Sequence, residues 1–126
     1  MKRLTFIIPP HLKFKDYVNP PKEHKEVMKK DGKRYGNLIT DMPLGPLALS
    51  SYLKKNLDIQ IILLDFNVEL NRLDAFHYNS FYDYFLEYFR NNHEYKDSDF
   101  FGLSCLYSPS YESMIDISKA LKKIFS

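Results

Sequence analysis

The chain has 126 residues, of which 44% are hydrophobic, 16% aromatic and 27% charged, with a formal net charge of +2 and one cysteine. This length suits a single domain, and the spread of apolar residues excludes global disorder, while one cysteine excludes an internal disulfide or a cysteine-rich metal site. No apolar run reaches about 18 residues, no signal peptide is recognisable and the net charge is small, so we expect a cytoplasmic protein that binds neither membrane nor nucleic acid.

The first predicted element is a strand over residues 4–8, which Pro9 and Pro10 end because proline cannot donate to a strand ladder. Residues 11–37 then contain eight lysines and arginines against four acidic residues, together with two prolines and two glycines. We therefore interpret 11–41 as a long basic loop, which is either solvated or faces a phosphate or a partner.

Two further apolar runs, residues 59–64 and 100–106, are predicted to be strands. Like the first run, they are continuous rather than alternating. That pattern is typical of a parallel sheet covered on both faces.

Three helices alternate with these strands. The first begins after Gly45, with Pro46 in its first turn. The second is an aromatic helix over 78–89, and the spacing of its aromatic residues favours core packing over a base-stacking platform. The third starts near Ser108, which can cap it. The predicted buried stripe of the first helix comprises Leu49, Tyr52, Leu53 and Leu57, and that of the third comprises Met114, Ile117, Leu121, Ile124 and Phe125.

This alternation predicts an α/β fold with a Rossmann-like (flavodoxin-like) doubly wound parallel sheet. Such sheets usually have about five or six strands. We therefore expect 1–126 to be a single domain and the N-terminal fragment of a longer chain, cut after three strands and three helices. The third strand would then have a bare apolar edge, through which a second copy or a partner would pair.

Ligands of doubly wound sheets bind beyond the carboxyl ends of the strands, near helix N-termini that offer free N–H groups. The candidate cofactor-binding residues at these places are Pro9, Pro10, His11, Leu44, Gly45, Asp65, Ser104, Cys105, Leu106, Tyr107 and Ser108. The glycine-rich fingerprints of dinucleotide and nucleoside-triphosphate sites are absent, and the four histidines lack metal-ligand spacing. We expect no catalytic or metal-ligating residue. Asp65 stands where a ribose-binding acid would stand, or caps the next helix locally.

Four segments share the order of a known motif set: Ile7-Ile8-Pro9-Pro10 after the first strand, Pro43–Leu53 at the first helix, Asp65 at the second strand end, and Phe101–Ser108 at the third strand. Together they resemble the N-terminal cobalamin-binding domain that precedes the radical S-adenosylmethionine barrel in a large group of bacterial and archaeal enzymes. That family typically has N-P-P, P-L-G-L-x-x-L-A-x-x-L and G-I-S motifs at these places. The resemblance covers nearly the whole chain.

The resemblance implies a Rossmann-like domain that holds cobalamin against its strand carboxyl ends, with the nucleotide tail entering the sheet. Residues 104–106 match the Ser-x-Leu that lines this tail in the wider cobalamin-binding fold. Pro9, Pro10 and Gly45 would form the adjacent walls.

Two features of the wider family are absent. When His11 is placed on the cobalt-ligating histidine of D-x-H-x-x-G, Pro9 replaces the aspartate and Phe14 the glycine, so cobalt ligation by His11 is not implied. One cysteine cannot bind a 4Fe-4S cluster, so the cluster and the S-adenosylmethionine site are expected in a C-terminal barrel of the same parent chain.

The function implied by the resemblance is a cobalamin-binding-type domain of a radical S-adenosylmethionine enzyme, such as a methyltransferase or a cyclase-like enzyme, that is not catalytic by itself. Two alternatives stay open. One is a non-catalytic protein-interaction domain that uses the third-strand edge or the basic loop. The other is a nucleotide-binding α/β domain that uses Asp65 for a ribose.

Overall fold

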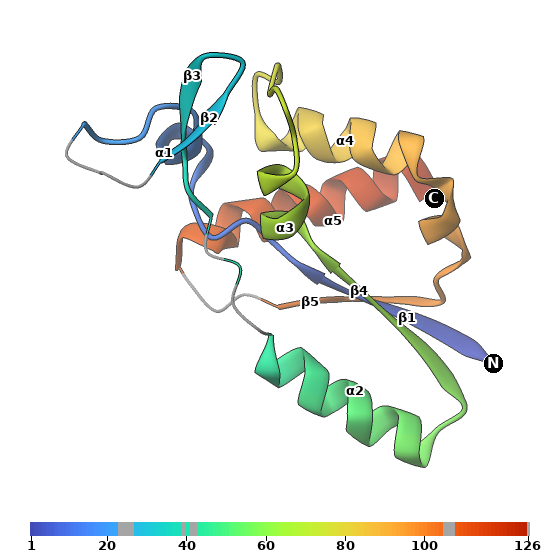
Figure 1. The fold of residues 1–126 in the computed structure, drawn as a ribbon. Helices are drawn as coiled ribbons and strands as arrows, with labels where there is room; N and C mark the ends of the chain where they lie inside the picture. Colours follow the sequence, from blue (N-terminus) through green and yellow to red (C-terminus); the bar gives the residue numbers. More distant parts are fainter. Residues whose placement is uncertain (23–26, 39, 41–42, 105–107, 126) are drawn as a thin grey trace.

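Three parallel strands in the order β4-β1-β5 form the main sheet of the protein (Figure 1). In the computed structural model, which describes residues 1–22, 27–38, 40, 43–104 and 108–125, these strands are β1 (Lys2–Ile8), β4 (Ile59–Asp65) and β5 (Phe100–Leu103). β1 pairs with β4 along its whole length and with β5 over four residues. The predicted α/β class and the positions of the three predicted strands are confirmed, although the third ends at Leu103 instead of continuing to residue 106 as predicted. The order is compatible with a Rossmann-like fold.

Helices cover both faces of this sheet (Figure 1). α2 (Leu44–Asn56) lies on one face, and α3 (Phe66–Asn71), α4 (Phe81–Asn91) and α5 (Tyr111–Phe125) lie on the other. Short 3-10 helices at His93–Asp97 and Ser108–Ser110 lead into β5 and α5, so the last α-helix begins three residues after the predicted cap. Within the described ranges no helix is both long and apolar enough to cross a membrane.

The hydrophobic core lies between the sheet and the α4–α5 pair. The Phe66 ring packs against Phe85 and Phe89 of α4, with centroids 4.8 Å and 5.9 Å apart, and all three are fully buried. Ile117 of α5 completes this layer with an exposed fraction of zero. The aromatic helix is therefore a core element, as its spacing predicts.

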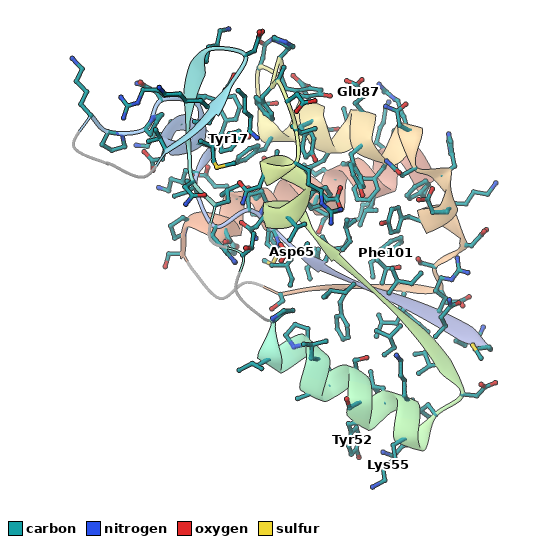
Figure 2. All side chains as sticks on the ribbon, viewed as in Figure 1. Tyr17, Tyr52, Lys55, Asp65, Glu87 and Phe101 are labelled. Carbon is teal, nitrogen blue, oxygen red and sulfur yellow. The ribbon has the colours of Figure 1, made fainter. Side chains whose placement is uncertain are left out.

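The face that carries α2 is covered much less. None of the residues of α2 is fully buried. Of its predicted buried stripe only Leu53 is half-buried, whereas Leu49, Tyr52 and Leu57 are 46%, 65% and 56% exposed, so the prediction for this stripe is wrong. Figure 2 shows Tyr52 on the side of α2 that points away from the sheet.

Strand side chains on this face are also exposed. Phe101 stacks on Phe125 of α5 with a centroid distance of 6.4 Å, so its neighbour Phe100 points to the opposite face. Phe100 is 56% exposed there, and Leu63 of β4 is 41% exposed. The sheet thus has one closed face and one open apolar face.

The stretch interpreted as a long loop contains regular structure. α1 (Phe14–Val18) is followed by an antiparallel hairpin of β2 (Val27–Lys30) and β3 (Lys33–Gly36). Asp31 and Gly32 form its two-residue turn with φ values of 52° and 76°. An Asp-Gly pair with positive φ at both positions suits the type I′ turn that joins two twisted strands.

Candidate functional site

The carboxyl ends of β1, β4 and β5 meet at one edge of the sheet. β1 continues into Pro9 and Pro10, which are both buried, and β4 ends at Asp65. β5 continues into the half-buried Ser104, whose backbone N–H donates to the carbonyl of Ile7 at 3.2 Å. The predicted residues Cys105, Leu106 and Tyr107 lie outside the described residues.

One side chain, that of Asn67, ties the loops after β1 and β4 together. Its amide nitrogen donates to the carbonyl of Pro9 at 3.1 Å and to Oδ1 of Asp65 at 3.0 Å, and its oxygen accepts the backbone N–H of His11 at 2.9 Å. Asn67 is fully buried, and its hydrogen bond to Pro9 is shielded from water, while those to Asp65 and His11 are partly buried. The segment from Pro9 to His11 is therefore fixed against the end of β4.

A second side chain, that of Ser110, holds the loop after β1 on the side of β5. Ser110, which is 1% exposed, donates through Oγ to the carbonyl of Pro10 at 2.9 Å. The predicted residue Ser108 is exposed in the same 3-10 helix. The buried carbonyls of Pro9 and Pro10 are both satisfied internally, as buried carbonyls require.

A cavity of about 370 Å³ opens beside Asp65, at the end of β4. It is lined by Thr40, Pro43, Leu63, Asp65, Val68, Glu69 and Arg72. Arg72 and Glu69 face each other at 3.7 Å, so the wall carries charges of both signs and a threonine hydroxyl. Oδ1 of Asp65 also accepts the backbone N–H of Asn67 at 2.9 Å, which makes Asp65 the N-cap of α3. This supports the interpretation of Asp65 as a local cap.

The N-terminus of α2 borders this cavity through Pro43, whose carbonyl accepts the N–H of Leu47 at 3.0 Å. The predicted residues Leu44 and Gly45 are both exposed, and Leu44 is 69% exposed. A Cβ added to Gly45 would meet no atom within 4 Å. Within the described part of the chain, therefore, no close contact requires glycine at this position.

The structure thus brings Pro9, Pro10, His11 and Asp65 into one network, while Leu44 and Gly45 lie at its margin. Sequence reasoning missed the two residues that build this network, Asn67 and Ser110. Asn67 stands two residues after a strand-ending aspartate, in the first turn of α3, where an Asx side chain often bonds the local backbone. That position was the available signal; Ser110 had none beyond its place in a helix-initiating S-P-S run.

The described residues do not fit a whole cobalamin. The corrin ring with its nucleotide tail is much larger than a cavity of about 370 Å³, which lies near the lower end of small-molecule pockets. At the carboxyl ends of the strands, Asn67 and Ser110 donate to the carbonyls of Pro9 and Pro10, which a ligand would otherwise meet. These residues fit one end of a large ligand, or one small polar group.

Among the side chains that the structure describes, no three His, Cys, Asp or Glu residues gather closely enough to hold a metal ion. Comparison of the chain with protein-family models, with curated proteins and with solved structures finds no match.

Proposed function

We propose that the chain is an α/β module of the cobalamin-binding type that is not catalytic by itself, and that its sheet edge forms one wall of a cofactor site. The rest of this site would come from a radical S-adenosylmethionine barrel of the same parent chain, which would also hold the 4Fe-4S cluster and S-adenosylmethionine. In such an assembly the cofactor supplies the chemistry, and this module supplies binding and orientation.

The observation that carries the proposal is the convergence of three strand ends at one edge of a parallel sheet. In open parallel sheets this edge is where ligands bind. Here Pro9 and Asp65 are held by the buried Asn67, so the wall is rigid before any ligand arrives. Ser104, the first residue of the expected Ser-x-Leu, is half-buried at the end of β5 beside Ile7.

The test is a titration of the chain with hydroxocobalamin, read from the visible spectrum and from co-elution on gel filtration. Since only one wall is present, we expect weak binding that Ser104→Leu abolishes, because leucine would fill the space beside the tail. The matched control is Ser51→Leu on the exposed surface of α2, which should bind like the unchanged chain. No binding by the unchanged chain, or equal binding by both variants, would overturn the proposal.

A second candidate function is self-association through the open apolar face. Its observation is that large apolar side chains are exposed on this side of the molecule, namely Leu63 and Phe100 of the sheet and Leu49 and Tyr52 of α2, which covers it. Among the described residues β5 pairs with β1 alone, which leaves its other edge open to a second copy of the chain.

Sedimentation velocity tests this second candidate. Self-association through the face predicts a dimer that Phe100→Asp and Tyr52→Asp both dissociate. Tyr111→Asp, on an equally exposed tyrosine of α5, should leave it intact. A monomer at all concentrations would eliminate this candidate and leave the first proposal untouched.

A further inference from the structure

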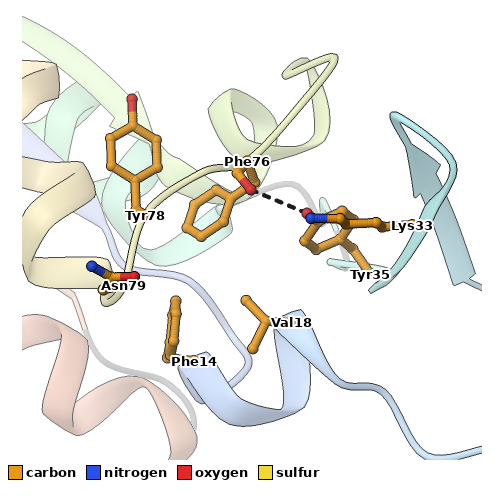
Figure 3. Close-up of a pocket in the computed structure, with 7 residues that line it drawn as sticks. All are labelled: Phe14, Val18, Lys33, Tyr35, Phe76, Tyr78 and Asn79. Carbon is orange, nitrogen blue, oxygen red and sulfur yellow. Dashed lines mark hydrogen bonds between the residues drawn. The ribbon is translucent and has the colours of Figure 1, made fainter.

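A separate cavity, which shares no lining residue with the cavity beside Asp65, lies between α1, β3 and the segment that joins α3 to α4 (Figure 3). Its volume is about 320 Å³. Its lining residues are Phe14, Val18, Lys33, Tyr35, Phe76, Tyr78 and Asn79. Four of these seven are aromatic, and the two remaining polar side chains, Lys33 and Asn79, are exposed.

The aromatic walls are fixed in place by buried hydrogen bonds. The hydroxyl of Tyr35 donates to the carbonyl of Phe76 at 3.1 Å, and both side chains are 4% exposed (Figure 3). Behind them Lys30, only 3% exposed, donates to the carbonyls of Asn71 at 3.2 Å and Leu73 at 2.6 Å, which locks the hairpin onto the end of α3. The cavity is therefore preformed rather than dependent on a ligand.

The remaining wall is aromatic as well. Phe14 packs edge-on against Phe81 with a centroid distance of 5.3 Å, and Tyr78 lies 5.0 Å from Phe76 in a similar arrangement. Phe14 and Tyr78 are half-buried, so both rings present surface to the cavity. Aromatic rings around a small cavity favour a flat aromatic guest.

The charge at the mouth is positive. The ammonium of Lys33 makes no hydrogen bond or ion pair with the side chain or backbone of another described residue. It belongs to the segment 11–37, in which eight lysines and arginines stand against four acidic residues. An anionic group on a guest would be attracted to this ammonium. The Glu87 carboxylate interacts with the hydroxyl of Tyr78, so the anionic group would lie at Lys33 rather than at the Tyr78 hydroxyl.

We propose that this cavity binds a small aromatic anion, with its ring against Phe14, Phe76 and Tyr78 and its phosphate or carboxylate at Lys33. The exposed amide of Asn79 lies on the rim and can hydrogen-bond a ring substituent or the anionic group. Binding at this cavity would give the basic segment 11–37 a specific role, and it does not depend on the proposed cobalamin-type function.

The experiment is an NMR titration of the ¹⁵N-labelled chain with phenyl phosphate. We expect chemical-shift changes confined to Phe14–Val18, Lys33–Gly36 and the 76–80 segment. Cyclohexyl phosphate, which lacks the π-system, and inorganic phosphate, which lacks the ring, should both bind at least about fivefold more weakly.

Lys33→Gln should weaken phenyl phosphate binding by about threefold to fivefold, the size of an exposed ion pair. Lys29→Gln, an exposed lysine on the neighbouring strand of the same hairpin, removes the same charge outside the cavity and should leave binding unchanged. Equal effects of the two variants would reduce the binding to general charge attraction and overturn the proposal. Shifts scattered over the surface, or equal affinity for inorganic phosphate, would overturn it as well.

Discussion

At the scale of single residues, Asn67 holds the sheet edge together because an amide donates and accepts at once. Neither Asp nor Leu could replace it. A carboxylate would repel Asp65 and could not donate to Pro9, and an apolar side chain would remove the hydrogen bonds to the Pro9 carbonyl and from the His11 N–H, while Oδ1 of Asp65 would keep the backbone N–H of residue 67.

Asn67→Ala should therefore lower the free energy of unfolding by about 2–4 kcal/mol. Asn56→Ala is the matched control. It removes an exposed amide that donates to the carbonyl of Tyr52 in its own helix, so its cost should stay below about 0.5 kcal/mol. Urea unfolding measures both variants. Equal costs would contradict the role of Asn67 as the tie between the loops.

Two neighbouring tyrosines should respond oppositely to loss of the hydroxyl. Tyr17 and Tyr35 pack with centroids 5.3 Å apart, but the buried hydroxyl of Tyr17 finds no partner in the described structure, whereas that of Tyr35 donates to Phe76. Tyr17→Phe should leave stability unchanged or raise it by up to about 1 kcal/mol, and Tyr35→Phe should lower it by about 1 kcal/mol. Thermal or urea unfolding measures both variants. A Tyr17→Phe variant that is less stable than Tyr35→Phe would contradict these roles of the two hydroxyls.

At the scale of elements, α2 and α5 show what the spacing of apolar residues in a helix can predict and what it cannot. Both helices carry apolar residues at spacings of three and four, and both were predicted with buried stripes. In α5 the stripe packs on α4 and Ile117 is fully buried, while in α2 Leu49 stays 46% exposed. A spacing reveals which side chains share a face, but not whether another element covers that face.

Ile117→Ala should therefore cost about 3 kcal/mol of unfolding free energy, and Leu49→Ala less than about 1 kcal/mol. Urea unfolding of the two variants measures the difference. The chain must be kept dilute, because a partner copy on the open face would raise the cost of Leu49→Ala. A cost equal to that of Ile117→Ala in the monomer would show that the face is closed.

The hairpin within 11–41 was predictable from the sequence. Asp31-Gly32 is among the strongest short-range hairpin signals, and residues 27–30 and 33–36 flank it. The high charge of the segment obscured this signal, since Lys29, Lys33 and Arg34 are exposed and only Lys30 and Tyr35 turn inward. Charge composition alone favoured a loop, and the turn residues carried the better information.

At the scale of the whole molecule, the buried tyrosines make the free energy of unfolding depend on pH in the alkaline range. Burial raises the pKa of Tyr17, Tyr84 and Tyr88 above the ordinary value. Interaction with Tyr35 raises the pKa of Tyr17 further, the charge of Glu69 that of Tyr84, and the hydrogen bond with Tyr95 that of Tyr88. In the unfolded chain these hydroxyls ionise near pH 10, whereas in the folded chain they stay protonated. Above pH 10 the folded state therefore binds more protons than the unfolded state, and stability falls as pH rises.

The free energy of unfolding should be insensitive to these groups below about pH 9 and should fall above pH 10 by up to about 1.4 kcal/mol per pH unit for each fully buried tyrosine. Urea unfolding at a series of pH values measures the slope. Tyr84→Phe should reduce this slope above pH 10 by the contribution of one tyrosine. A slope that is unchanged in this variant, or stability that rises with pH, would contradict the assignment.

The sequence could predict which strand ends converge, because parallel strands joined by crossovers place their carboxyl ends at one edge. It could not predict what fills that edge. Asn67 reaches Pro9 across 58 positions of sequence and Ser110 reaches Pro10 across 100, and such contacts exist only once the sheet order is set. The aromatic cavity combines Phe14, Lys33 and Phe76 in the same way.

The most direct test of the central claim is to map where cobalamin contacts the chain, by NMR of the ¹⁵N-labelled protein with a diamagnetic cobalamin. We predict shift changes at Ile8, Asp65, Asn67 and Ser104, at the carboxyl edge of the sheet, and none in the hairpin β2–β3. Cobinamide, which lacks the nucleotide tail, should leave Ser104 unperturbed. Changes elsewhere on the molecule, or none at all, would contradict the claim that this edge is a cofactor wall.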